Sequence, residues 1–377
     1  MYTTTLPCAI PEALREEFSK RLAYVSEGLV EPRLEDCQRL TYQLRNGFEH
    51  QASTISAHIC DVAEKLCANP EPAAKTIASR AKFPTPYAQD PHISLLAQGD
   101  LFAFGRGRYG FGPRMTALVH SFDARIQQAA GQCGAGARTF PSLIGAGALD
   151  RCRYLKNFPS SLNLVSHLRE DHRVLQDFVS SVQWDGSGLD FASGSASPVE
   201  CLLAPSVCFH WYEWLRESRL DQPSLITALG KCFRYESSNL TGLERLWDFT
   251  MRELVFVGPE TYVLSQRDKM VQVAVQLLEE WGLAYEITTA SDPFFIDNYA
   301  IQAAYQQGYE LKYELLVPLP YSGKKLAVGS INYHQDFFGR CFSIEAEGGP
   351  AHTGCIGFGL ERLALAFLAQ HGHFLAT

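Results

Sequence analysis

Apolar residues recur three or four positions apart along most of the first seventy residues of the chain. Three such stripes span 14–29, 34–44 and 55–66, the first beginning after Pro11 and the second after Pro32. Apolar residues at this spacing lie on one face of a helix. The pattern therefore predicts a small N-terminal domain built of helices.

A cluster of prolines follows this region. Pro84, Pro86 and Pro91 fall within a single short stretch. Proline interrupts regular structure, and such clusters are typical of segments that connect domains. We therefore expect an N-terminal helical bundle with a proline-rich linker over residues 1–90, and a second domain over residues 91–377.

The hydrophobic pattern becomes mixed beyond the linker. Alternation of apolar and polar residues predicts a hairpin over 99–112 and strands over 309–318 and 329–338. Helical spacing returns in three segments, 115–130, 269–281 and 359–370. The last of these is apolar nearly all round, which predicts a buried helix.

Composition narrows the class of protein. Of the 377 residues 46% are hydrophobic and 20% are charged, and the formal net charge is -8. A nonspecific nucleic-acid-binding protein would carry a basic surface, so that class is disfavoured. The eleven cysteines form no CxxC pair, and we see neither a signal peptide nor an apolar stretch long enough to cross a bilayer. We expect reduced thiols, no membrane partner and a cytoplasmic location.

The stretch 231–258 carries charged and aromatic residues in a strand-like order. A strand over 232–236 would point Arg234 and Glu236 to one face. After a polar turn, a returning strand would bring three residues spaced four apart to that face, namely Arg245, Phe249 and Glu253. Cations for phosphate, a ring for a base and a carboxylate for its amino group together suit an adenine nucleotide. The same spacing also fits a helix over 243–254, so periodicity leaves both readings open.

The order of these residues resembles motif 2 of class II aminoacyl-tRNA synthetases, Phe-Arg-x-Glu at 233–236 and then Arg-x-x-x-Phe-x-x-x-Glu at 245–253. The string Gly-Cys-Ile-Gly-Phe-Gly-Leu-Glu-Arg at 354–362 is similar to motif 3 of the same class. A looser likeness to motif 1, the dimer-forming helix and strand, falls at 138–158. The resemblance implies an α+β fold with an antiparallel sheet flanked by helices, and a homodimer.

The resemblance also implies that ATP and an amino acid react here to form an aminoacyl-adenylate. Arg234 would hold the α-phosphate and the amino-acid carboxylate, and Arg245 would hold the β- and γ-phosphates. Glu236 would read the adenine amino group, while Phe249 and Arg362 would stack on the two faces of the base. Arg234 and Arg362 are thereby implied as the catalytic cations.

Residues 203–210 resemble the zinc-cysteine segment of threonyl-type and atypical seryl-tRNA synthetases. This likeness implies a Zn²⁺ site made of Cys208, Glu253 and Cys355, with an open fourth position that takes the α-amino group of the substrate. Two thiolates, a carboxylate and an open position suit a catalytic zinc ion. Spacing alone would favour packed thiols for both cysteines.

Mg²⁺ is expected to accompany ATP, but its protein ligand is left open. The family places a carboxylate on the strand before motif 3, whereas Lys325–Asn332 contains none. The alternatives are Asp336, Glu345 and Glu347. Asn332 and His334 are candidates for polar contacts in the substrate site, or for structural hydrogen bonds.

The segments 232–253, 329–339 and 353–362 are similar to those of amino acid:[carrier protein] ligases, truncated homologues of atypical seryl-tRNA synthetases. Members pass the aminoacyl group from the adenylate to the phosphopantetheine thiol of a carrier protein. Membership implies a small substrate such as glycine, alanine or serine, and no tRNA partner. Charges over 1–82 nearly balance, about ten basic against eleven acidic, which does not suggest a tRNA-binding arm.

Two alternatives remain open. One is a zinc-dependent seryl- or threonyl-type aminoacyl-tRNA synthetase. The other is a non-catalytic synthetase paralogue that acts as a binding subunit. The presence of Arg234, Glu236, Arg245, Phe249 and Arg362 argues against the second.

Overall fold

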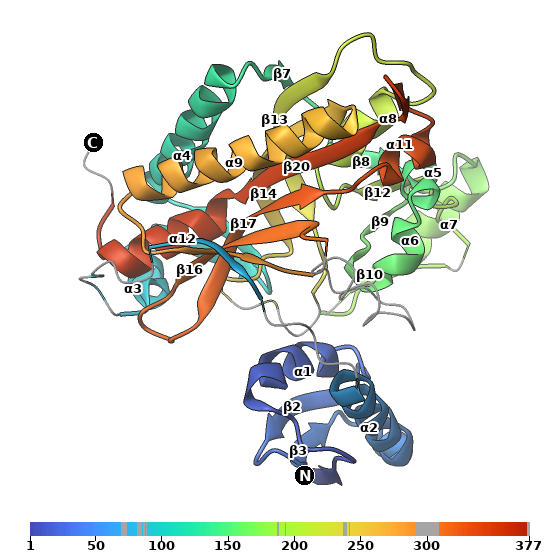
Figure 1. Cartoon of the computed structure of the whole chain (residues 1–377). Coiled ribbons are helices and arrows are strands. Elements are labelled where there is room, and N and C mark those ends of the chain that lie inside the picture. Colours follow the sequence, from blue (N-terminus) through green and yellow to red (C-terminus); the bar gives the residue numbers. More distant parts are fainter. Residues whose placement is uncertain are drawn as a thin grey trace.

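The computed structural model describes residues 1–68, 74–80, 85, 87, 89–186, 188–192, 194–236, 240, 242–291 and 309–374. These residues form a small N-terminal unit and a larger unit built around one extended sheet (Figure 1). The apolar core of the N-terminal unit is a separate cluster from those of the large unit.

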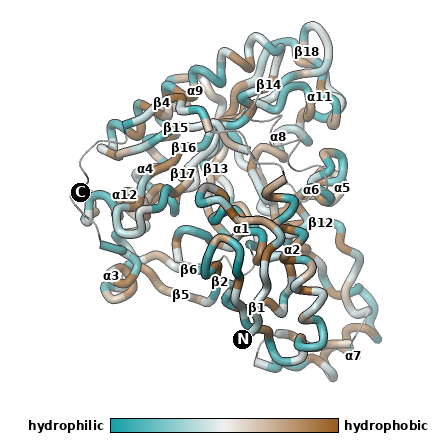
Figure 2. The backbone as a smooth tube through the Cα atoms, turned by 60° about the horizontal axis from the view of Figure 1, so that its bottom comes forward, coloured by the Kyte–Doolittle hydropathy of each residue, from teal (hydrophilic) through white to brown (hydrophobic). Residues whose placement is uncertain are grey.

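The N-terminal unit packs two helices on a three-stranded antiparallel sheet. The strands are β1 (Tyr2–Thr5), β2 (Leu29–Leu34) and β3 (Arg39–Leu44), in the order β1-β3-β2. The helices are α1 (Arg15–Leu22) and α2 (Ala52–Ala68), with the short 3-10 turns Glu12–Leu14 and Glu49–Gln51 before them. Along α1 and α2 the tube changes between hydrophobic and hydrophilic colours, as expected of helices with one buried face (Figure 2).

The helix expected over 55–66 is confirmed, and the one expected over 14–29 is confirmed only as far as Leu22, because Leu29 begins a strand. The helix expected over 34–44 is wrong, and with it the expectation of a purely helical N-terminal bundle. Leu40 and Tyr42 are buried while Arg39 and Gln43 are exposed, which is the alternation of a strand. Leu40 and Leu44 of this strand lie four positions apart, so their spacing fits a period of two as well as a helix. Cys37, which only helical spacing brought into the stripe, is exposed.

The large unit is organised around an eight-stranded sheet with the order β4-β15-β16-β17-β20-β14-β13-β7. All neighbouring strands are antiparallel except β7 and β13, which run parallel. The strands are β4 (Thr76–Ser79), β7 (Gly136–Arg138), β13 (Ser224–Phe233), β14 (Asp248–Gly258), β15 (Glu286–Thr289), β16 (Lys312–Pro318), β17 (Lys325–Tyr333) and β20 (His352–Gly359). Because β4 lies within 1–90, that range also supplies a strand of the large sheet, which the expected domain division did not foresee.

Helices flank this sheet, as expected (Figure 1). The long ones are α4 (Pro113–Gln132), α9 (Glu260–Glu280) and α12 (Leu360–His371). The shorter ones are α3 (Pro91–Ala97), α5 (Ala146–Arg151), α6 (Tyr154–Asn157), α7 (His172–Ser181), α8 (Cys208–Trp214) and α11 (Phe337–Phe342), with a 3-10 turn η3 (Pro159–Ser161).

Short strands complete the unit. The hairpin expected over 99–112 is confirmed as β5 (Leu101–Gly105) and β6 (Arg108–Phe111). The others are β10 (Gln183–Trp184) with β11 (Leu189–Asp190), β18 (Glu345–Ala346) with β19 (Gly349–Pro350), and β12 (Cys201–Leu203) between β8 (Leu143–Gly145) and β9 (Leu164–Val165).

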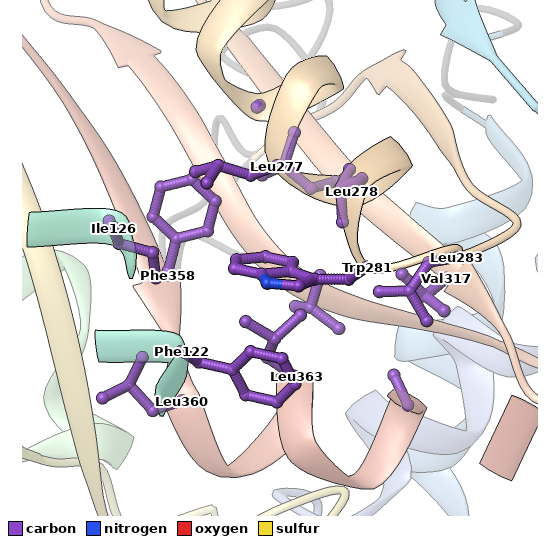
Figure 3. Close-up of a cluster of buried hydrophobic side chains, with 14 of the residues drawn as sticks. Phe122, Ile126, Leu277, Leu278, Trp281, Leu283, Val317, Phe358, Leu360 and Leu363 are labelled. Atoms are coloured by element: carbon purple, nitrogen blue, oxygen red, sulfur yellow. The ribbon is translucent and has the colours of Figure 1, made fainter. Parts of the chain in front are cut away.

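The main core lies where α4, α9 and α12 meet the sheet. Trp281, just beyond α9, packs edge-on against Phe122 of α4, with ring centroids 4.8 Å apart (Figure 3). Leu363 of α12 lies in the same cluster. The predicted burial of the C-terminal helix is confirmed, since most of α12 is excluded from solvent. This core fixes β20 and β14, which carry the site, relative to α12.

Candidate nucleotide and metal site

Strands β13 and β14 form the first wall of the site. Their register pairs Cys232 with Phe249 and Ala228 with Glu253. Phe249 and Glu253 are four residues apart on β14, so they point to the same face of the sheet. The helix considered for 243–254 is therefore wrong, because Asp248–Gly258 is a strand.

Arg234 and Glu236 lie just beyond β13, where the chain remains extended alongside its partner. The Arg234 amide donates a hydrogen bond to the Trp247 carbonyl at 2.9 Å. Its side chain donates from Nε to the Pro205 carbonyl at 2.9 Å, and its guanidinium carbon lies 5.4 Å from the centre of the Phe249 ring. The structure thus places the proposed phosphate-binding cation beside the proposed base-stacking ring.

Arg245 departs from its expected position. It lies in the turn before β14 and not on the returning strand itself. The expected polar turn at Ser237, Ser238 and Asn239 lies outside the described residues. From its turn, Arg245 forms an ion pair with Glu236, so the two side chains still meet on the predicted surface.

Arg362, at the start of α12, completes this group of charges. Its Nε donates to the Glu244 carbonyl at 2.6 Å and one terminal nitrogen donates to the Ala327 carbonyl at 3.3 Å. Burial raises the pKa of Glu236, but the nearby guanidinium groups of Arg245 and Arg362 outweigh it and lower that pKa below its usual value. Glu236 is therefore an anion surrounded by cations.

Motif 3 forms the end of β20 and the start of α12. The Glu361 carboxylate, which is buried, accepts hydrogen bonds from the Thr250 amide on β14 at 2.9 and 2.8 Å. Gly357 stands where a Cβ would come within 2.5 Å of the Met251 side chain. Small residues here let β20 approach β14 closely. The hydrogen bonds between Glu361 and Thr250 fix the first turn of α12, from which the Arg362 side chain extends.

Three buried side chains form a second cluster beside the charges. Cys208 at the start of α8, Glu253 on β14 and Cys355 on β20 place one ligand atom each within 4.8 Å of one another. All three are buried. Two sulfurs and one carboxylate oxygen at this separation fit a single tetrahedral Zn²⁺ ion with one further position. The structure therefore brings together the three residues that the sequence resemblance implied.

Hydrogen bonding sets the charge of this cluster. Cys208 donates to the sulfur of Cys355, and this bond together with burial raises the pKa of the Cys208 thiol. The same bond lowers the pKa of Cys355, which also benefits from His334 and Asn332. Burial and the nearby Cys355 charge raise the pKa of Glu253 to about 7. The two thiols and the carboxylate therefore act strongly on one another's pKa, as groups buried this close together do.

Sequence reasoning missed the residues that orient Glu253. Its two carboxylate oxygens accept from the Val207 amide at 3.0 Å and the Cys208 amide at 2.9 Å. The Ser206 hydroxyl donates to one of them at 2.7 Å and also lies 3.3 Å from the Cys208 sulfur. Ser206 precedes Cys208 by two positions, but no periodicity marks it, because the contact with Glu253 joins segments nearly fifty residues apart.

Asn332 and His334 both border the metal cluster. The Asn332 amide nitrogen donates to Ser330 at 3.1 Å and lies 3.6 Å from the Cys355 sulfur. His334 places Nε2 3.9 Å from the same sulfur, while its Nδ1 lies 3.1 Å from the Thr353 hydroxyl. Each candidate therefore makes structural hydrogen bonds and also lies within the site.

The three carboxylates suggested as Mg²⁺ ligands are paired with arginines or exposed to solvent. Asp336 pairs with Arg340 at 2.7 Å, Glu345 lies 3.7 Å from Arg219, and Glu347 is exposed. Glu314 on β16, by contrast, is close enough to Arg362 to act on its pKa, and it lies 3.2 Å from the Lys312 ammonium group. The register Glu314–Ser330–Gly357–Glu253 across four strands puts its side chain on the same face of the sheet as Glu253.

The sequence is similar to known synthetases and ligases over the segments that form this site. Residues 200–371 match the model of the tRNA synthetase class II core domain (G, H, P, S and T). Amino acid–[acyl-carrier-protein] ligase 1 of Bradyrhizobium diazoefficiens is 36% identical over 65% of this chain and 74% of its own length. Ligase 2 of that organism is 35% identical over 63% of this chain and 70% of its own length.

Synthetases are also similar to this chain, over more of its length. A type-2 serine–tRNA ligase of Methanococcus maripaludis is 26% identical over 97% of this chain and 72% of its own. The structure of M. kandleri SerRS in complex with A. aeolicus tRNASec superposes with a TM-score of 0.70 at 21% identity, covering 99% of this chain and 74% of that chain. This likeness shows the fold. In the described part of the chain, no helix has the length and apolar character needed to cross a bilayer.

Proposed function

The chain belongs to the family of amino acid–[acyl-carrier-protein] ligases, and we propose that it activates a small amino acid with ATP and loads it onto a phosphopantetheinylated carrier protein. The observation that carries this proposal is the adjacency of two groups on one face of the sheet. Arg234, Glu236, Arg245 and Arg362 form one group, and the buried Cys208–Glu253–Cys355 cluster forms the other.

In the first step an oxygen of the amino-acid carboxylate attacks the α-phosphorus of ATP. The bond from that phosphorus to the bridging oxygen breaks, and pyrophosphate leaves. Arg234 would hold the carboxylate and the α-phosphate together, while Arg245 would leave Glu236 for the β- and γ-phosphates. Glu236 would accept from the adenine amino group, and the base would stack between Phe249 and Arg362. Positioning and charge stabilisation are enough for such a displacement.

Cys208, Glu253 and Cys355 would hold Zn²⁺, which supplies a Lewis-acid position for the α-amino group of the substrate. The amino end and the carboxylate end of the substrate would then both be fixed. Only the side chain remains to distinguish amino acids, and the space is bordered by Asn332 and His334. We propose glycine, alanine or serine. A pocket separates single methylene groups by only about 1–3 kcal/mol, so these three are expected to overlap.

For Mg²⁺ we propose Glu314 as the protein ligand, in place of the three carboxylates suggested by the sequence. Its position beside Arg362 supports this choice, since Mg²⁺ binds phosphate oxygens together with one or two carboxylates. Glu314 would leave Lys312 for the ion, and Lys312 would remain close to the phosphates.

In the second step the phosphopantetheine sulfur of the carrier attacks the carbonyl carbon of the adenylate. The bond to the phosphate oxygen breaks, AMP leaves, and the thiol proton passes to solvent. The names of the two Bradyrhizobium relatives support a carrier protein as acceptor. We further propose that the enzyme works in the cytoplasm as a homodimer.

The deciding experiment supplies the enzyme with ATP and each of the twenty amino acids and measures exchange of pyrophosphate into ATP. The best amino acid, radiolabelled, is then offered with holo-carrier protein and, separately, with total tRNA. Label on the carrier, released by hydroxylamine as a thioester is, is the expected result. Apo-carrier, which lacks the thiol, is the matched control. Label on tRNA and none on the carrier would overturn the proposal.

A seryl-tRNA synthetase is the second candidate function, because one observation favours it. The M. maripaludis serine–tRNA ligase matches 97% of this chain, and therefore much of the N-terminal unit, whereas the two ligases match 63% and 65%. The tRNA arm of the same experiment tests this candidate. A lack of pyrophosphate exchange with every amino acid would instead favour a non-catalytic paralogue.

A further inference from the structure

The hairpin of β5 and β6 (Figure 2) ends in the sequence Gly-Arg-Gly-Arg at 105–108, a turn that has no part in the site described above. Gly107 adopts a left-handed conformation with a φ of 67°, which glycine allows without strain. A Cβ at this position would lie 2.9 Å from the Trp247 amide nitrogen and 3.0 Å from the Leu240 side chain. Glycine at 107 therefore lets the turn lie directly against the segment that resembles motif 2.

Hydrogen bonds fix the hairpin turn at the border of the nucleotide site. The Trp247 amide donates to the Gly107 carbonyl at 2.9 Å, and the Trp247 carbonyl accepts from the Arg234 amide at 2.9 Å. Arg245, which would hold the β- and γ-phosphates, precedes Trp247 by two positions. Trp247 thus connects the hairpin turn to the backbone that carries both of these proposed phosphate-binding arginines.

The turn carries two exposed positive charges, Arg106 and Arg108. In the described part of the chain, neither guanidinium group forms an ion pair or a hydrogen bond. The arginines inside the site, by contrast, are held by carbonyl or carboxylate oxygens. Arg106 and Arg108 are therefore available to an anion that approaches the site from solvent.

Exposed aromatic rings lie on the same hairpin. Phe102 and Phe104 are 62% and 64% exposed, and their ring centroids are 4.8 Å apart. Surfaces that bind a partner are enriched in aromatic residues and arginine, and exposed apolar groups that lie together often mark such a surface. The hairpin thus presents both kinds of group at the border of the nucleotide site.

We propose that Arg106 and Arg108 bind the phosphodiester of the carrier's phosphopantetheine arm during aminoacyl transfer. The thiol at one end of the arm has to reach the adenylate beside Arg234, whereas the phosphodiester at the other end stays near the carrier, at the border of the site. A phosphodiester carries one negative charge, and a guanidinium group can bind two of its oxygens with parallel hydrogen bonds. A pair of arginines fits one such group, whereas a tRNA acceptor would bring a series of phosphates and require more cations.

This inference rests on the carrier acceptor of the proposed function. Its test compares the full-length protein with its variant Arg106→Ala/Arg108→Ala, using two small thiols as acceptors: phosphopantetheine, which carries the phosphate, and pantetheine, which does not. The wild type should use phosphopantetheine with a kcat/KM about tenfold higher, the gain expected of one hydrogen bond between charged groups. The variant should lose this preference, and its KM for holo-carrier should rise by a similar factor. Pyrophosphate exchange, in which no acceptor takes part, should keep its rate.

Arg33→Ala/Arg39→Ala is the matched control, because it removes the same charge from exposed positions of the N-terminal unit. It should keep both the preference and the KM for holo-carrier. A wild type that loads holo-carrier but treats the two small thiols alike, or a variant that keeps the preference, would overturn this inference alone. Transfer to tRNA that depends on Arg106 and Arg108 would assign the turn to a nucleic acid and overturn it as well. A wild type that transfers to no thiol would overturn the proposed function together with this inference, so the two kinds of failure are distinguishable.

Discussion

At the scale of single residues, the two arginines proposed as catalytic cations are fixed in orientation by the protein backbone. Arg234 and Arg362 are held by backbone carbonyls, of Pro205 in one case and of Glu244 and Ala327 in the other. Their guanidinium groups are therefore oriented before any anion arrives. Preorganised cations of this kind need no rearrangement at the moment of reaction, which makes them effective in stabilising a transition state.

Arg362→Ala and Arg234→Ala should each slow adenylate formation by orders of magnitude. Removing a preorganised donor that faces developing charge commonly costs about 3–4 kcal/mol. Pyrophosphate exchange under saturating substrates measures the effect. Arg362→Lys keeps the charge and loses the planar fork, so it should recover only part of the rate. An Arg362→Ala protein with normal exchange kinetics and a normal melting curve would contradict the role given to motif 3.

Zinc should be present at about one ion per chain. Alanine at Cys208, Glu253 or Cys355 should remove the metal and the activation together, since each is proposed as a direct ligand. Ser206→Ala removes the hydroxyl that orients Glu253 and should weaken zinc binding about 10- to 100-fold. Elemental analysis and competition with a chromogenic chelator measure both effects. Full activity in a metal-free preparation would count decisively against the site.

Zinc binding should also weaken as the pH falls from 8 to 6. Burial and the Cys355 charge raise the pKa of Glu253 to about 7 in the metal-free protein, so below that pH a proton competes for the carboxylate. Glu253→Gln, which carries no ionisable group, should bind zinc weakly with a flatter dependence on pH. The stability of the metal-free fold depends on pH in the opposite direction. Because the pKa of Glu253 is higher in the folded protein than in the unfolded chain, its carboxyl group stabilises the fold at low pH. That stabilisation is lost as the pH rises through 7.

At the scale of elements, the sequence was most informative where hydrophobic period and polar motif agree. The buried helix after motif 3 was foreseen from its apolar residues, and the hairpin at 101–111 from its glycines and its alternation of apolar and polar residues. The strand at 39–44 was not, because Leu40 and Leu44 lie four positions apart, a spacing that fits a helix and a strand equally well. The strand at 29–34 was missed because Leu29 fits the helical stripe that begins at Leu14.

In the site too, residues within a motif could be predicted, whereas contacts between segments distant in sequence could not. The motif strings identified the residues that the structure brings together. They could not show that Arg245 sits in a turn, since four-residue spacing looks identical on a strand. Nor could they reveal Ser206, whose partner is set by packing between segments distant in sequence.

The glycines of motif 3 offer a test of how closely β20 must approach its neighbours. A Cβ at Gly354 would lie 2.2 Å from the Phe256 ring and 2.8 Å from the Asn332 carbonyl oxygen. Gly354→Ala should therefore destabilise the protein by about 1–3 kcal/mol, as overpacking usually does. At Gly359 the nearest atom is 3.8 Å away, so Gly359→Ala should cost less than about 1 kcal/mol. Urea denaturation compares the two, and equal losses would contradict this account of β20.

At the scale of the whole molecule, the large sheet ends at two quite different edges. One edge is β4, supplied by the segment after the N-terminal unit, and the other is β7, which follows the long helix α4. In the part of the chain that the structure describes, β7 pairs only with β13. A sheet edge is a template for pairing with another chain unless it is protected. The helix and strand α4–β7 directly precede the segment that resembles motif 1, the dimer-forming element.

We therefore expect a homodimer with α4 and β7 at its interface. Sedimentation at micromolar concentration should give twice the 42.0 kDa of one chain. Ala137 is exposed on β7, and a two-fold interface brings the same surface of both copies together, so Ala137→Asp would place two like charges near each other. This variant should shift the mass towards one chain without changing the circular dichroism spectrum. Ser181→Asp, at the exposed end of α7, adds the same charge elsewhere and should remain dimeric. A wild-type protein that sediments as a monomer at micromolar concentration would rule out the dimer.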